Sequence, residues 1–201
     1  TNSKALKMPV ALIDLLAGHQ LKEAILLALL KRYQTNKGCH LSVSLFDSAI
    51  ASLANQATNW LIGNQLPQPI GSIHPNIAPY GELFDTKDKQ LVTFAIGNNR
   101  QFKQLCELIG FAALANDTKF ATNQLRVSNR LELYSLLYNY IKQFNFKELY
   151  RACEKREVPI GKIRNLKEVF DLPEAQAMIK KFSFNKKQYQ SVSGIAFKFL
   201  N

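Results

Sequence analysis

The sequence predicts an α/β protein with a small module of a β-hairpin and helices between about residues 64 and 162. Three observations lead to this prediction. Apolar residues recur at helical spacing within residues 14–37, as on the buried side of a helix. Two strand-like runs flank the polar turn 86–89. A loop rich in proline and glycine precedes the first of these runs.

The amino-terminal part is predicted to contain a helix, a strand and a second helix. The first helix, residues 14–37, would end at Gly38, because a left-handed residue after a helix favours glycine. Cys39–Val43 alternates like a short strand. Ser44–Asp47 reads as a capping box that opens the second helix, which extends to about Gly63. These two helices would leave broad apolar faces bare, which is typical of a connecting scaffold.

The composition changes in residues 64–79, which contain four prolines together with glycine, serine and asparagine. Loops of this length in compact proteins are usually functional or disordered. Strands are expected at Tyr80–Phe84 and Gln90–Ile96.

Most of the remaining chain is predicted to be helical, apart from the turn-rich residues 116–123 and a final strand at Ser191–Leu200. Pro173 stands at a favourable first position of a helix. The other expected helices are Arg100–Ile109, Ser128–Gln143, Phe146–Lys155 and Leu166–Phe170.

The chain is basic, with 26 Lys and Arg against 15 Asp and Glu and a net charge of +11. The excess concentrates from Tyr140 onward, where 13 basic residues face 6 acidic ones. Nucleic-acid binding, attraction of a polyanionic small molecule and a solvated face could each explain it. No RNP-type aromatic motif, zinc-finger spacing or compact Lys/Arg block is present, which disfavours nucleic acid. From charge alone, a solvated face is favoured.

The cysteines disfavour a metal site. Cys39, Cys106 and Cys153 show neither CxxC spacing nor a nearby pair of histidines. Reduced thiols in a cytoplasmic protein are therefore expected. No apolar run approaches the length that crosses a bilayer, so no membrane partner is expected.

Chemistry-bearing residues are few, and no complete catalytic constellation is found. His19 and His40 fall in a predicted helix and strand, where a structural role is the more common one. His74 stands out because it lies in the proline-rich loop beside Asn76 and Tyr80, although no acidic residue adjoins it. Serine-nucleophile and phosphate-loop motifs are absent.

Six segments, taken together in their order and spacing, resemble the family III CoA-transferases. This group is also called the CaiB–BaiF family and is similar to the alpha-methylacyl-CoA racemases. The resemblance covers nearly all of residues 9–180. The segments are VALIDLLAG (10–18), KGCHLSVSLFDSAIASLANQATNWL (37–61), HPNIAPY (74–80), VTFAIGNNRQFKQLCELIG (92–110), FATNQLRVSNRLEL (120–133) and VPIGKIRNLKEVFDLPEAQA (158–177).

The resemblance implies transfer of CoA from an acyl-CoA to a carboxylic acid through an aspartyl-CoA intermediate, with CoA as substrate and no permanently bound cofactor. It also implies that a lid loop covers the reacting groups. Two prolines and a histidine replace the glycine run of other members, so a stiffer lid is expected. Its matching residues are Gly71, Ser72, His74, Pro75, Asn76, Ile77, Ala78, Pro79 and Tyr80.

The family pattern further implies that residues 64–162 form a small domain, with 1–63 and 163–201 belonging to a large one. The catalytic aspartate would precede residues 10–18, so no catalytic residue is expected in this chain. Activity would then require a homodimer of the complete protein or a separate amino-terminal half, and the chain alone would be inactive. The alternatives are half of a racemase-like enzyme and a non-catalytic remnant or binding module.

Overall fold

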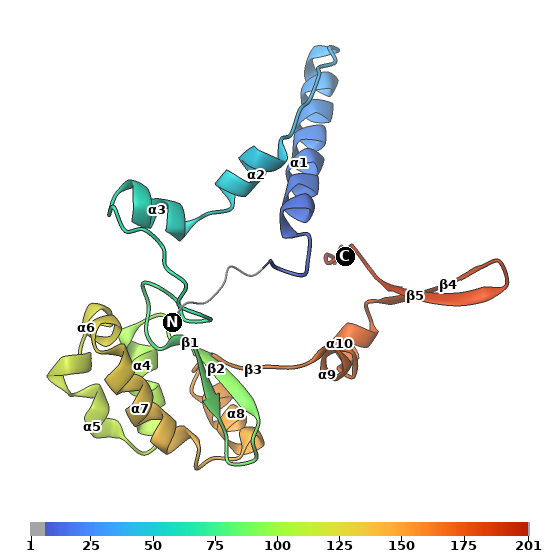
Figure 1. Ribbon diagram of the computed structural model, residues 1–201. Coiled ribbons are helices and arrows are strands. Elements are labelled where there is room, and N and C mark those ends of the chain that lie inside the picture. The colour runs from blue at the N-terminus through green and yellow to red at the C-terminus, as the bar shows by residue number, and fades with distance from the viewer. Residues whose placement is uncertain (1–6, 201) are drawn as a thin grey trace. The chain divides into compact units, whose positions relative to one another are not determined.

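The computed structural model describes residues 7–200 (Figure 1). The chain divides into two compact units, residues 1–71 and 72–201, each described here by itself. The predicted segments that begin at residue 1 or end at residue 201 extend beyond the described residues. Their assignment to a large and a small domain stays a prediction.

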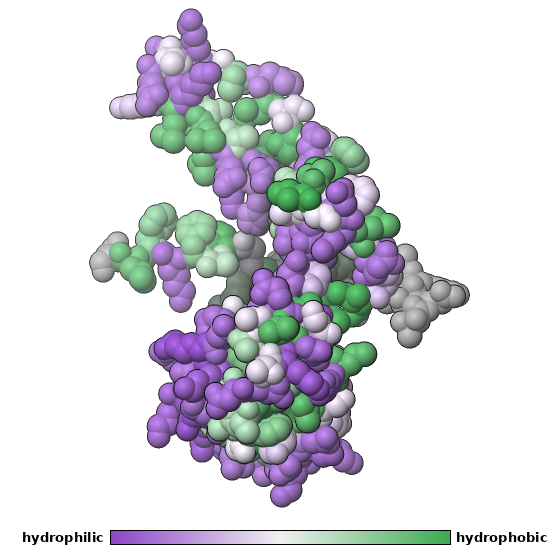
Figure 2. Space-filling view, turned by 90° about the vertical axis from the view of Figure 1, so that its left-hand side faces the viewer, coloured by the Kyte–Doolittle hydropathy of each residue, from purple (hydrophilic) through white to green (hydrophobic). Residues whose placement is uncertain are grey.

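The first unit contains a 24-residue helix, α1 (Leu12–Thr35), close to the predicted helix. Its left-handed C-cap is Asn36, with φ of 59°, and not Gly38 as predicted. The helix ends earlier than expected because asparagine also tolerates this conformation. No residue of α1 is buried. Figure 2 shows hydrophobic side chains exposed at the surface, in keeping with the bare apolar faces that the sequence predicts for the two amino-terminal helices.

The predicted strand at 39–43 is wrong, since these residues form no strand. A strand needs a neighbour to bond its backbone groups, and the described part of this unit offers none. The predicted second helix is interrupted and forms α2 (Leu45–Ala51) and α3 (Asn55–Leu61). Ser44 accepts a hydrogen bond from the Asp47 amide at 3.2 Å, as expected of the N-cap. The break comes at Ala54, whose φ of 49° cannot continue a helix.

The second unit contains an antiparallel sheet in the order β1-β2-β3. The predicted hairpin is confirmed as β1 (Tyr80–Asp85) and β2 (Leu91–Ala95). A third strand, β3 (Ile160–Lys162), pairs with β2 and was not predicted. Three residues are too few for an alternating pattern to be recognised, so only the pairing reveals this strand.

Helices pack on one face of this sheet and form the core with it. Phe84 and Phe94 are buried on neighbouring strands. Their rings pack edge to face, with ring centres 5.6 Å apart. The principal helices are α4 (Asn99–Leu108), α7 (Arg130–Ile141) and α8 (Phe146–Lys155). Short α5 (Ala112–Ala115), the 3-10 turn η1 (Thr118–Phe120) and α6 (Asn123–Ser128) connect α4 to α7. Buried residues contributed by the helices include Phe102, Leu105, Leu133, Leu137, Ile141 and Leu149.

The helix predicted at 128–143 is confirmed as α7, with each end two residues shorter. The preceding α6 was not predicted, and Asn129, whose φ and ψ of −104° and 26° are not helical, separates the two helices. Residues 146–155 match their predicted bounds as α8. Asn98 caps α4 by accepting from the Gln101 amide at 2.9 Å.

The carboxyl-terminal segment also differs from the prediction. Helices α9 (Leu166–Phe170) and α10 (Pro173–Gln176) form as expected. The next residues form a two-stranded hairpin of β4 (Ile179–Phe184) and β5 (Lys187–Val192), whereas 193–200 contain no strand. Asn185 and Lys186 both have positive φ, which is the geometry of a tight hairpin turn. Lysine instead of glycine at the second position conceals this turn in the sequence.

Among the described residues, no helix is long and apolar enough to cross a membrane.

Asp88 joins the hairpin turn to the start of α8, so its ionisation should affect stability. Its carboxylate accepts from the Thr86 hydroxyl at 2.6 Å and from the Phe146 amide at 2.9 Å. These hydrogen bonds, the Thr86 bond first, lower the pKa of Asp88 below its usual 3.8. The stabilising contribution is therefore complete above pH 3.8 and is lost as pH falls through the lower folded pKa.

We predict that Asp88→Asn, which keeps an acceptor oxygen but does not titrate, loses this part of the pH dependence. Urea unfolding of the wild type and the variant should show a stability difference at neutral pH that shrinks in strong acid. Asp88→Ala should be less stable than Asp88→Asn at both pH values. Parallel pH profiles for the wild type and Asp88→Asn would contradict the prediction.

Candidate functional site

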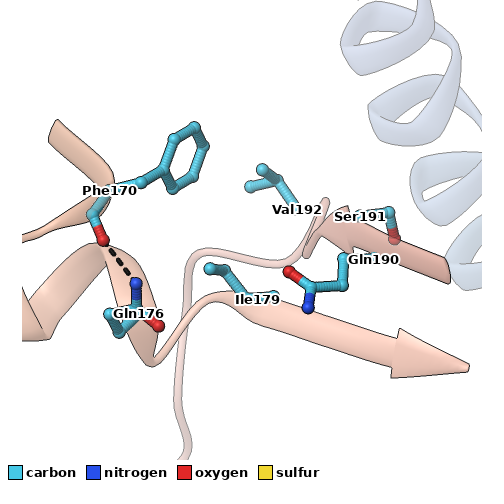
Figure 3. Close-up of a pocket in the computed structure, with 6 residues that line it drawn as sticks. All are labelled: Phe170, Gln176, Ile179, Gln190, Ser191 and Val192. Carbon is cyan, nitrogen blue, oxygen red and sulfur yellow. Dashed lines mark hydrogen bonds between the residues drawn. The ribbon is translucent and has the colours of Figure 1, made fainter. Parts of the chain in front are cut away.

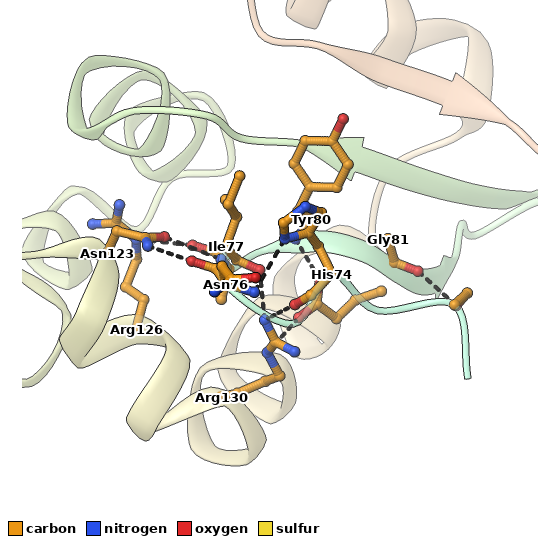
Figure 4. Close-up of polar contacts among 11 residues, drawn as sticks. His74, Asn76, Ile77, Tyr80, Gly81, Asn123, Arg126 and Arg130 are labelled. Atoms are coloured by element: carbon orange, nitrogen blue, oxygen red, sulfur yellow. Dashed lines mark hydrogen bonds and ion pairs between the residues drawn. The ribbon is translucent and has the colours of Figure 1, made fainter. Parts of the chain in front are cut away.

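The loop singled out by the sequence leads directly into β1, and its residues 72–80 lie in the second unit (Figure 4). Backbone bonds fold it against the sheet. The His74 amide donates to the Tyr80 carbonyl at 2.8 Å, and the Ile96 amide of the neighbouring chain segment donates to the Pro79 carbonyl at 3.2 Å. The Ala78–Pro79 peptide bond is cis. Gly71 falls in the first unit.

Arg126 on α6 holds the buried end of the loop. Its side chain is 1% exposed, and Nε donates to the Ala78 carbonyl at 2.9 Å. The other nitrogens donate to the Phe120 carbonyl and to Oδ1 of Asn99 at 3.0 and 2.9 Å. The guanidinium also lies 4.5 Å from the centre of the Phe102 ring. Burial lowers the pKa of Arg126, and these acceptors offset the cost of removing its charge from water.

Arg130, at the start of α7, holds the middle of the loop. One terminal nitrogen donates to the His74 carbonyl at 2.6 Å and to the Ile77 carbonyl at 2.5 Å. Nε lies 3.2 Å from Oε1 of Glu82, with side chains only 13% and 5% exposed. The second carboxylate oxygen of Glu82 accepts from the Tyr80 amide at 2.5 Å. One buried ion pair therefore ties the loop, β1 and α7 together.

Asn123 completes the contact between the helices and the loop. Its side-chain oxygen accepts from the Ala78 amide at 3.2 Å, and its side-chain nitrogen donates to the Asn76 carbonyl at 2.7 Å. Asn123 and Arg126 on α6 and Arg130 at the start of α7 all reach the loop through their side chains. We call these three residues the loop clamp. Two arginines four residues apart among apolar residues were a usable signal for it in the sequence, but no contact with the loop was predicted from them.

The predicted loop residues take different positions. Ala78 and Pro79 are buried, Ser72 and Asn76 are exposed, and His74 is half-buried. The His74 ring lies 5.1 Å from that of Tyr80, and its Nδ1 accepts from the Asn76 amide at 3.1 Å. The structure thus brings His74, Asn76 and Tyr80 together and uses Ala78 and Pro79 as anchors. Loop rigidity was predicted from the prolines and the histidine, and the clamp supplies a further physical cause for it.

A separate cavity of about 390 Å³ lies beside the carboxyl-terminal hairpin (Figure 3). The Gln176 side chain, which lines the cavity, donates to the Phe170 carbonyl at 2.5 Å. No titratable side chain lines the cavity, so its residues cannot transfer protons. The lining residues are Phe170, Gln176, Ile179, Gln190, Ser191 and Val192.

The cysteines and the other histidines form no second site. Burial raises the pKa of both Cys106 and Cys153 to about 12, so both stay protonated thiols at neutral pH. Cys39 is exposed. His19 contacts Lys22 on the exposed surface of α1 at 3.1 Å, and His40 lies in the segment that forms no strand. Residues 7–200 contain no group of three or more His, Cys, Asp or Glu that could hold a metal ion.

Comparison with known proteins identifies relatives over almost the whole chain. The sequence pattern of CoA-transferase family III matches residues 1–199. The chain is 36% identical to the succinate–glutarate CoA-transferase of Agrobacterium fabrum and 37% identical to the human succinyl-CoA:glutarate CoA-transferase. These alignments cover 88% and 86% of this chain but only 44% and 39% of those proteins. The chain therefore spans less than half the length of these relatives.

A solved structure gives the same family. The crystal structure of a CaiB/BaiF family protein from Brucella suis is 36% identical to this chain, with a TM-score of 0.68. The match covers 98% of this chain and 51% of that protein. The mixed fold of helices and strands agrees with this neighbour.

We predict that Gly81→Ala destabilises the second unit by at least ~2 kcal/mol, because the backbone at this position excludes a side chain. Gly81 has a φ of 88°, and a Cβ there would overlap the carbonyl oxygen of Ser72. Gly161→Ala on β3 is the matched control, since its Cβ would make an ordinary contact with the Thr93 methyl at 3.9 Å. Urea unfolding compares the two variants, and equal stabilities would contradict the prediction.

The ion pair between Arg130 and Glu82 should show strong coupling. Removing one partner leaves the other charge buried and unpaired, so we expect Arg130→Met and Glu82→Gln each to cost about 3 kcal/mol. The double variant should cost less than the sum, because it leaves no buried charge. A double-mutant cycle measured by urea unfolding checks this, and additive losses would show that the pair is not coupled.

Proposed function

Since this chain belongs to CoA-transferase family III, we propose that it forms part of an enzyme that moves CoA from an acyl-CoA to a carboxylic acid. The observation that carries the proposal is the match of the family pattern over residues 1–199. The geometry of the loop at 72–80 supports it, because a loop held in one conformation can shape the space around reacting groups.

We propose dicarboxylic acids as the substrate class. The relatives from Agrobacterium and human are named for succinate and glutarate, two dicarboxylic acids. Acyl-CoA and the free acid are then the two substrates, and CoA takes part as a substrate and not as a resident cofactor. A net charge of +11 favours the approach of such anionic molecules.

The proposed reaction proceeds through an aspartate nucleophile. Its carboxylate attacks the thioester carbonyl of the acyl-CoA, the carbon–sulfur bond breaks, and a mixed anhydride and CoA thiolate form. The thiolate then attacks the aspartyl carbonyl, which releases the first acid and leaves an enzyme-bound CoA thioester. The incoming carboxylate repeats both steps in the opposite order, and no proton is consumed. Covalent catalysis divides one difficult exchange into easier steps.

We assign the nucleophile to no aspartate of this chain. Those of the second unit near the hairpin have structural partners. Asp85 accepts from the Tyr138 hydroxyl at 3.0 Å, and Asp88 holds the start of α8. Asp117 caps the 3-10 turn by accepting from the Lys119 amide at 2.8 Å. More than half of each relative lies outside the region that this chain matches, and we place the nucleophile in that part.

The proposed role of residues 71–80 is to cover the reacting groups. A mixed anhydride is hydrolysed by water, so excluding water protects the intermediate. The loop clamp suits this role, because it fixes the carbonyls of His74, Asn76, Ile77 and Ala78. We propose that the site is completed by residues outside this chain, supplied by the rest of the enzyme or by a second copy.

We predict that this chain completes an enzyme with the part of the Agrobacterium protein that it does not match. The two polypeptides are co-expressed and assayed with succinyl-CoA and glutarate. We expect glutaryl-CoA from the pair and none from either polypeptide alone. Mass spectrometry after addition of succinyl-CoA should find a CoA adduct on an aspartate of the complementary polypeptide. A co-purifying pair that transfers no CoA, or an adduct on this chain, would contradict the proposal.

A further inference from the structure

The ring nitrogen Nε2 of His74 remains available after the clamp has formed. His74 Nδ1 accepts from the Asn76 amide, whereas Nε2 has no hydrogen-bond partner among the described residues. The ring is half-buried and lies beside Tyr80. Figure 4 shows it above the Arg130 guanidinium, which reaches the loop from the helix side.

The hydrogen bond from Asn76 decides which nitrogen carries the proton. An amide N–H can donate to Nδ1 only if this nitrogen offers a lone pair. In this tautomer the ring proton is on Nε2. The backbone of loop 74–76 thereby makes His74 Nε2 a hydrogen-bond donor.

The position of the donor is fixed as well as its chemistry. The His74 amide is bonded to the Tyr80 carbonyl at 2.8 Å, and the His74 carbonyl is bonded to Arg130 at 2.6 Å. The backbone amide and the backbone carbonyl of His74 are therefore both restrained. The ring adds its own contact with Tyr80 at 5.1 Å. A donor restrained in this way loses little conformational entropy on binding.

The surroundings suit an anion. Residues 64–81 contain no Asp or Glu. The nearest acidic residue along the chain, Glu82, is 5% exposed and paired with Arg130, so its charge is already compensated. A carboxylate can therefore approach Nε2 without facing an unpaired negative side chain of the loop.

We propose that His74 Nε2 donates a hydrogen bond to the carboxylate of the acid substrate that does not react, with Arg130 and Asn76 as its positioning residues. The inference rests on the proposed function, in which the acid is a dicarboxylate. The reacting end loses its charge when it becomes an acyl group. The other end keeps its charge through every step, so a donor that does not move suits that end.

The test uses three variants of His74 in the co-expressed pair. His74→Asn can still accept from the Asn76 amide but lacks the distal donor. His74→Gln reaches further and can place an amide donor near the position of Nε2. His74→Phe keeps the ring contact with Tyr80 and has neither polar group. Glutarate and butyrate, which differ by one carboxylate at similar length, are compared as acceptors.

We expect His74→Asn and His74→Phe to raise the KM for glutarate about tenfold or more, with little change in kcat or in the KM for butyrate. His74→Gln should restore part of the affinity for glutarate. A purely structural role would change both acceptors alike. Equal effects on glutarate and butyrate, or an unchanged KM for glutarate in His74→Asn, would overturn the proposal.

A second measurement needs no catalysis. Nitrogen-15 NMR of this chain in the co-expressed pair should find the His74 proton on Nε2, and the Nε2 resonance should move on addition of glutarate but not of the neutral diamide glutaramide. A proton on Nδ1, or no difference between the two compounds, would overturn the inference about His74. Absence of CoA transfer in the wild-type pair would contradict the proposed function instead, so the two failures are distinguishable.

Discussion

The conformation of the loop depends on one constraint, namely that two arginines reach its carbonyl groups from a neighbouring helical segment. Arg126 is 1% exposed, and a buried guanidinium must have acceptors for its N–H groups. The loop carbonyls supply them, and in return the arginines satisfy backbone groups that a loop cannot pair within itself. If either the loop or the arginines moved away, polar groups of the other would be left without hydrogen bonds. The loop and the α6–α7 segment therefore form one structural unit.

This unit is continuous with the sheet and the core. Glu82 lies on β1 and pairs with Arg130, while the far end of the same hairpin is tied to α8 through Asp88. The loop therefore has more restraint than its prolines alone would give. Any opening that takes place during a reaction must either carry α6 and α7 along or be confined to residues before His74. That distinction bears directly on the covering role proposed for it.

The first unit shows a different balance. Its longest helix buries no residue, so packing within this unit cannot account for the many leucines and isoleucines of α1. Intrinsic propensity and helical spacing formed the basis of its prediction, and the observed helix agrees with it. The strand expected at 39–43 failed for the opposite reason, because a strand requires a partner that local sequence does not reveal.

The sequence by itself determined the elements whose signals are local. These include the hairpin of β1 and β2, the bounds of α8 and α9, and the presence of a histidine in an unusual loop. Local patterns also carried the family resemblance, because its segments are contiguous. Only the tertiary structure decided the role of Arg126, whose acceptor at Ala78 lies 48 positions away, and the pairing of β3. The physical reason is that these hydrogen-bond partners become neighbours only when distant segments pack together, and no pattern within a short window records that packing.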